Sequence, residues 1–215
     1  MPKPFDDDLE LLEAEVEYLR CRATRVVVEE RKLAAIHEMD TGGDAQDGGT
    51  AIHDHQCRLL LIKDREKALR DEIDARLQVH RQDAARPKLG LDRLTENHRL
   101  SPDERMLVVA AAIPAISQTL AEATFHDLGS MYGALSTEDL ARLQSPGTVR
   151  EWVEARRLMD PKAPLVKEGL LVVEQDDTGT PSDLWQTSAV YVSPRVLWLL
   201  TGEPEPTVPT NGTMH

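Results

Sequence analysis

The feature that most constrains the fold is an unbroken stretch from Asp6 to Met39 that contains no proline and no glycine. Its apolar residues recur at alternating steps of three and four, which places them on one stripe of an α-helix. Three aspartates stand at its start, where the positive end of a helix dipole favours carboxylates. The stretch therefore predicts a long amphipathic helix with an apolar stripe formed by Leu9, Leu12, Val16, Leu19, Ala23 and Val26.

A second long helix is predicted from about Asp54 to Ala85, because Arg86-Pro87 ends it. Between the two helices the sequence DTGGDAQDGGT has four glycines and a single alanine as its only apolar residue. It therefore predicts a flexible linker near residues 40–52. Two long amphipathic helices joined in this way favour an antiparallel, coiled-coil-like hairpin over residues 1–88.

The remainder, residues 89–203, has shorter helices and more turns. Ser101-Pro102-Asp103-Glu104 is a strong helix start, with serine as N-cap and glutamate three residues later. The apolar run from Met106 to Ile113 that follows predicts a central core helix, which Pro114 ends or bends. Further short helices are expected through Leu120–His126, from Ser136, and from Thr148 to about Met159, the last with a buried face of Val149, Trp152, Val153 and Leu158.

A β-hairpin is expected after these helices. Residues 169–175 are rich in valine and leucine, residues 176–183 form a turn-like tract, and residues 184–192 alternate as a strand does. A last short helix follows from Ser193, and residues 204–215 have the composition of a tail or linker. The order of helices and then a two-stranded hairpin is a winged-helix pattern. The predicted fold is therefore mainly α, with a long helical hairpin followed by an α+β winged-helix domain.

The charge of the chain bears on its partners. Lysine and arginine total 25 against 38 acidic residues, a formal net charge of −13, which repels nucleic-acid phosphates and anionic membranes. The natural recognition helix mixes arginines with glutamates, and the expected wing tip carries three aspartates. Protein docking is therefore favoured over DNA binding. The basic residues of the helix are Arg150, Arg156 and Arg157, and the acidic residues of the helix and wing tip are Glu151, Glu154, Asp176, Asp177 and Asp183.

No catalytic, cofactor-binding or metal-binding residue is expected. His53, His55 and Cys57, with His37 from the facing helix, could supply metal ligands, but their spacing matches no tetrahedral site. Residues 43–50 resemble a phosphate loop only superficially, because glycine replaces the lysine. His126-Asp127 is an isolated neighbour pair. A small metal-dependent enzyme using the two histidines of the 53–55 segment is the weakest of the functional hypotheses.

The two cysteines and the apolar runs indicate a cytoplasmic protein. With a turn near residue 46, Cys21 would face residue 72 and lie far from Cys57, so a disulfide between them is disfavoured. The charged start shows no secretion signal, and no run approaches the ~20 apolar residues of a membrane span.

Three segments carry a family resemblance: Leu100–Ile116, Thr148–Glu174 and Tyr191–Glu203. They resemble the winged-helix domain found ahead of the motor in certain bacterial AAA-type ATPases, some of them encoded with contractile injection systems. The resemblance covers about half the chain, residues 91–203. In that family the ATP-binding and metal-binding residues lie in a downstream motor domain, so none can be carried over to this chain.

The leading hypothesis is thus a non-catalytic, protein-binding N-terminal region of an AAA-type ATPase, or a motor-less relative of one. The resemblance implies partners among injection-system or cargo proteins, with homo-oligomerisation through the hairpin left open. The alternative hypothesis is a transcriptional regulator that dimerises through the hairpin and reads DNA with the winged helix.

Overall fold

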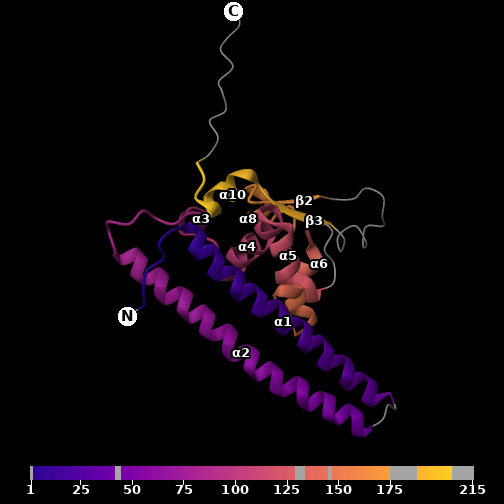
Figure 1. The fold of residues 1–215 in the computed structure, drawn as a ribbon. Coiled ribbons are helices and arrows are strands. Elements are labelled where there is room, and N and C mark those ends of the chain that lie inside the picture. Colours follow the sequence, from indigo (N-terminus) through magenta and orange to yellow (C-terminus); the bar gives the residue numbers. More distant parts are fainter. Residues whose placement is uncertain (1, 42–44, 129–133, 145–146, 175–187, 205–215) are drawn as a thin grey trace, which may run out of the picture.

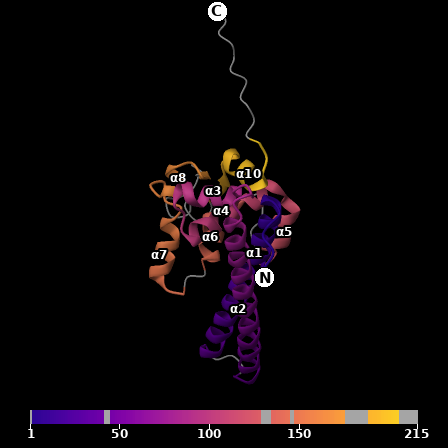
Figure 2. The same ribbon diagram turned by 90° about the vertical axis from the view of Figure 1, so that its left-hand side faces the viewer.

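The computed structural model describes residues 2–41, 45–128, 134–144, 147–174 and 188–204. They form a mainly helical protein with a small three-stranded antiparallel sheet (Figure 1). Two long helices lie along one side of the molecule, and the shorter elements gather at their base. The free end of the helix pair extends beyond the rest of the chain (Figure 2).

The first long helix, α1 (Asp8–Asp40), begins at the N-cap Asp7, whose side chain accepts a 2.8 Å hydrogen bond from the backbone N–H of Glu10. The second, α2 (Ala45–Gln82), runs beside it in the opposite direction. Ion pairs cross between them along their length, from Arg76–Glu10 near the start of α1 to Lys63–Glu29 further along.

The turn between these helices differs from the sequence prediction. A linker is expected near residues 40–52, whereas α2 already begins at Ala45 and takes in the second glycine pair. The earlier start changes the register, because less chain is available for the turn. Cys21 therefore lies against Ile62, with its Sγ 3.5 Å from the Ile62 carbonyl oxygen, and not near residue 72. Both thiols, of Cys21 and Cys57, are free.

The next helices are α3 (Gly90–His98), α4 (Pro102–Ile116) and α5 (Gln118–Phe125). The capping box at Ser101 is formed as predicted, with Ser101 and Glu104 each bonded to the other's backbone N–H. Pro114 lies inside α4, which continues two residues beyond it. Gly90 packs directly on the last helix, α10 (Pro194–Thr201), since a Cβ atom there would lie 1.6 Å from the carbonyl oxygen of Leu199.

The remaining elements build the sheet and its supporting helices. They are η1 (His126–Leu128), β1 (Leu135–Ser136), α6 (Thr137–Leu143), α7 (Val149–Arg157), α8 (Pro164–Lys167), β2 (Leu171–Glu174), β3 (Ala189–Val192) and α10 (Pro194–Thr201). The strand order is β1-β3-β2, with Val172 opposite Tyr191 and Leu135 opposite Val190. The predicted strand pair is confirmed, while its turn tract and the tail beyond residue 204 lie outside the described residues.

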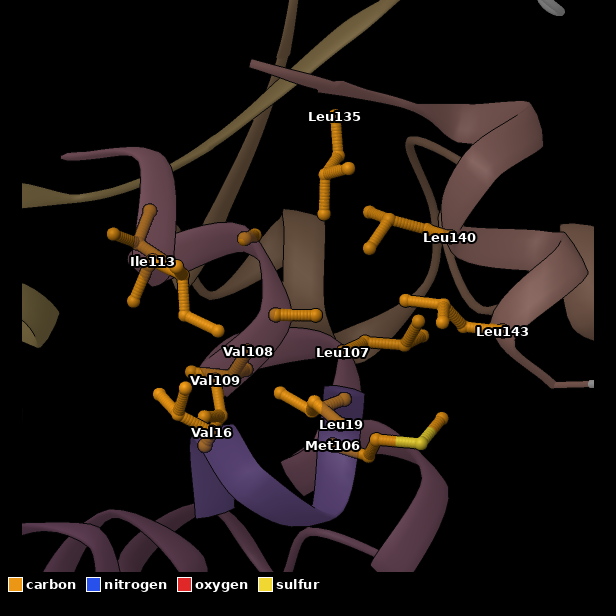
Figure 3. Packing of buried hydrophobic residues seen from close by; sticks show 14 of the residues in the cluster. Val16, Leu19, Met106, Leu107, Val108, Val109, Ile113, Leu135, Leu140 and Leu143 are labelled. Carbon is orange, nitrogen blue, oxygen red and sulfur yellow. The ribbon is translucent and has the colours of Figure 1, made fainter. Parts of the chain in front are cut away.

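One hydrophobic core joins α1 to the shorter elements. Every residue from Met106 to Ile113 in α4 is buried, as the apolar run predicts. Figure 3 shows Val16 and Leu19 of α1 on one side of α4, with Leu135 and Leu140 on the other. The core is thus continuous across the boundary at residues 88 and 89 that the sequence predicts.

Candidate interaction surface

The chain order is β1, α6, α7, α8, β2, β3, so α7, with nine residues, is the last helix of more than about one turn before the strand pair β2–β3. This is the position that a recognition helix occupies in a winged helix. Its start is set locally by a capping box: Glu151 N–H donates to Thr148 Oγ1 at 3.2 Å, and Thr148 N–H donates to Glu151 Oε2 at 2.9 Å. The sequence predicts this start correctly.

The predicted buried face of α7 is confirmed in part. Trp152 and Leu158 are half-buried and pack against the core, as predicted. The prediction was wrong for the two valines, because Val149 is 82% exposed and Val153 is 44% exposed. Trp152 and the buried Ala155, three residues apart, share the side of α7 that faces the core, and the two valines lie outside it. Met159, just beyond the end of the helix, is buried as well.

The outward face of α7 carries charges of both signs. Arg150 donates to Glu154 at 3.0 Å, and the exposed Arg157 stands near the end of the helix. Glu151 is engaged in the capping box. Glutamates therefore interrupt the arginines, and the described part of α7 has no continuous positive stripe. The predicted wing-tip aspartates at 176, 177 and 183 lie outside the described residues.

Two arginines fix α6, and thereby the start of α7, against α1. Arg142 of α6 donates to both carboxylate oxygens of Glu30, at 2.8 and 2.6 Å. Arg22 of α1 donates to the carbonyl oxygens of Leu143 and Gln144, at 2.5 and 3.4 Å, where α6 ends. The hydrogen bonds that Arg142 donates to Glu30 raise the pKa of Arg142 despite partial burial. The long helices thus position the surface that α7 exposes.

A buried ion cluster at the base of the long helices was missed by sequence reasoning. Glu15 is 2% exposed and accepts hydrogen bonds from Arg70 of α2 and Arg105 of α4. Arg70 also lies 5.4 Å from the centre of the Tyr18 ring, and burial raises the pKa of Tyr18. The one signal of this cluster in the sequence is the position of Glu15, a charged residue directly beside Val16 of the apolar stripe. Three-way contact between α1, α2 and α4 cannot be read from helical periodicity.

Of the residues considered as metal ligands, the structure brings one pair together. Cys57 Sγ and His53 Nε2 are 3.6 Å apart, one helical turn along α2, while His37 lies on α1. In the described part of the chain, no group of three or more histidine, cysteine or acidic residues could hold a metal ion. His126 and Asp127 are exposed neighbours in η1.

The segment that superficially resembles a phosphate loop is helical where it is described. Residues 45–50 form the first turns of α2, so they offer no loop of backbone N–H groups around an anion. Among the described residues, no helix has both the length and the apolar character that a membrane span requires.

Comparison with known proteins agrees with this topology. A family model described as "Winged helix domain, variant" matches residues 1–208, which includes both long helices. No curated protein and no solved structure matches the chain. Because the family model spans nearly the whole chain and the strand order fits, the protein belongs to the family of variant winged helix domains.

Proposed function

We propose that the chain is a non-catalytic docking module that binds another protein through the exposed face of α7. The observation that carries the proposal is the strong exposure of Val149, together with Val153 one turn later and the half-buried Trp152. Burying an aliphatic side chain of this size in an interface contributes about 1.5–3 kcal/mol. Protein interfaces place such apolar groups, and tryptophan above all, at their centre.

The charges of α7 support a protein partner over a DNA duplex. Phosphate contacts need cations that are free to face the backbone of DNA, yet Arg150 is already paired with Glu154. The net charge of −13 opposes approach to a polyanion at long range. The winged-helix topology by itself fits either partner, and the surface chemistry of α7 supports a protein.

We further propose that this module serves an AAA-type ATPase, as its N-terminal region or as a separate adaptor, and that it acts in loading partners such as injection-system proteins. The support is the resemblance of three segments: Leu100–Ile116, Thr148–Glu174 and Tyr191–Glu203. If this is right, a GxxxxGK[ST] phosphate loop lies downstream in the same gene, or an ATPase carrying one co-purifies with the chain. Absence of both would refute this part of the proposal.

The docking role is tested by capture from lysate of the native host with matched variants. Proteins bound by the wild type should be lost with the double variant Val149→Asp/Val153→Asp. They should be retained by Leu33→Asp, which introduces one aspartate at an exposed leucine of α1. Circular dichroism establishes that the three proteins are equally folded. Binding that survives the double variant would contradict the role of α7.

DNA binding is tested separately by titrating labelled duplexes with the wild-type protein at moderate salt. We expect no saturable binding. If the wild type binds and the variant Arg156→Ala/Arg157→Ala does not, the chain is a DNA-binding regulator and the protein-docking proposal is wrong.

A further inference from the structure

A groove runs between the two long helices, away from α7. Its volume is about 310 Å³, and all of its lining residues belong to α1 or α2. Its lining is mainly apolar and basic, with one carboxylate, Glu17; the apolar and basic residues are Leu61, Ile62, Leu69, Arg20, Arg58 and Arg65. Leu61 is 72% exposed, so the described chain leaves a large aliphatic side chain of the groove in contact with water.

Two arginines of this groove, Arg58 and Arg65, differ from several others on the same helices. Arg22, Arg25, Arg70 and Arg76 each form an ion pair with a carboxylate. Within the groove, Arg20 pairs with Glu17 at 2.6 Å.

By contrast, neither Arg58 nor Arg65 has a carboxylate within ion-pair distance among the described residues. In a chain of net charge −13, two arginines of one groove without a carboxylate partner among the described residues, beside the exposed Leu61, form a local site for negative charge.

The spacing of these two arginines fits a third helix. Arg58 and Arg65 are seven residues apart on α2, which is about 10.5 Å at the rise of an α-helix. Leu61 and Ile62 lie between them on the same side of α2. A helix lying in a groove between two antiparallel helices meets it with side chains at the same heptad spacing. Carboxylates seven residues apart on such a helix would face the two arginines, with apolar residues between them facing Leu61.

We propose that the groove between α1 and α2 binds an acidic amphipathic helix of another protein. The recognised pattern is a carboxylate at position i, apolar residues at i+3 and i+4, and a second carboxylate at i+7. The bound helix completes a three-helix bundle with α1 and α2. A second copy of this chain as the occupant is a separate outcome, which the test below distinguishes.

This inference shares with the proposed function the premise that the chain binds proteins, but it uses a different surface. The two can therefore fail separately. The variant Val149→Asp/Val153→Asp leaves the groove unchanged, and variants of the groove leave α7 unchanged.

The test uses the full chain and designed peptides of about 20 residues, a length at which an amphipathic helix forms readily on a partner. The acidic peptide has Glu at i and i+7 with Leu at i+3 and i+4, and the matched basic peptide has Lys in place of Glu. Fluorescence anisotropy of the labelled peptides measures binding. We expect the acidic peptide to bind the wild type at least about tenfold more tightly than the basic peptide, a difference of about 1.4 kcal/mol.

Charge reversal and removal of the apolar contact identify the site. Arg58→Glu/Arg65→Glu should weaken binding of the acidic peptide about tenfold or more and strengthen binding of the basic one. Leu61→Asp, on α2, should weaken binding of the acidic peptide. Leu33→Asp, at an exposed leucine of α1 outside the groove, should not. No binding of the acidic peptide, or equal binding by the wild type and the double-reversal variant, overturns the proposal.

Cys21 lines the same groove and gives a second readout. In a Cys57→Ser background, bound acidic peptide should slow alkylation of Cys21 by iodoacetamide, and the basic peptide should not. Alkylation that is unchanged at saturating acidic peptide would place the peptide elsewhere and refute the groove as its site. If the chain alone sediments as a dimer and the Arg58→Glu/Arg65→Glu variant sediments as a monomer, the groove serves self-association and the proposal is wrong.

Discussion

Replacing Glu15 by glutamine should destabilise the protein by about 3 kcal/mol, because it leaves buried arginine charge without its carboxylate. The Glu15 side chain is 2% exposed and joins Arg70 at 3.2 Å and Arg105. At an effective dielectric of about 20, each such pair contributes roughly 4 kcal/mol of Coulomb attraction at a separation of about 4 Å. The glutamine retains the size of the side chain and some of its hydrogen bonding, so charge is the quantity that changes.

Arg70 and Arg105 do not lose the same interaction energy when the carboxylate of Glu15 is removed. Arg70 keeps a second carboxylate, Asp74, at 2.7 Å and is partly exposed, so it recovers much of its interaction. Arg105 has an 11% exposed side chain, and Glu15 is the carboxylate with which it forms an ion pair in the described chain. We therefore place the expected loss at the lower end of the about 3–5 kcal/mol that follows removal of one partner from a buried pair.

Urea unfolding followed by circular dichroism measures this loss through the linear dependence of the unfolding free energy on denaturant. Glu17→Gln is the matched control, because Glu17 lies on the same helix in an exposed pair with Arg20 and should contribute less than about 1 kcal/mol. Adding Arg105→Met to Glu15→Gln should restore part of the stability, since no buried charge then lacks a partner. Equal effects of Glu15→Gln and Glu17→Gln would refute the reasoning.

Three further outcomes are expected. Gly90→Ala should lower the thermal midpoint because its Cβ has no space, whereas Gly49→Ala, in open space within α2, should raise stability by up to about 1 kcal/mol. Despite partial burial, hydrogen bonds from a backbone N–H and from an arginine lower the pKa of Glu10 below its ordinary 4.5. The stabilisation from Glu10 is therefore present above pH 4.5 and is lost as the pH falls through the lowered pKa. The difference in unfolding free energy between the wild type and Glu10→Gln, measured by urea unfolding, should shrink on acidification. Iodoacetamide should alkylate Cys57 faster than Cys21, as followed by mass spectrometry, because burial raises the pKa of the Cys21 thiol.

The sequence by itself determined the features that depend on local interactions. The capping boxes at Ser101 and Thr148 set helix starts through groups three residues apart, and those starts are found where the sequence predicts them. The apolar run determined the buried central part of α4, because a helical segment without a polar face can only lie inside. The strand pair β2–β3 followed from two β-prone segments on either side of a turn tract.

Only the tertiary structure decided which faces and which partners meet. The two-residue strand β1 was not predicted, because its pairing with β3 joins segments more than fifty residues apart and leaves no periodic pattern. In α7, Ala155 is buried and Val149 is exposed, and the burial of Glu15 depends on arginines from two other helices. Helical periodicity states that one face is buried, but the shape and charge of the surface it meets come from distant parts of the chain, and these select the face and the pairs.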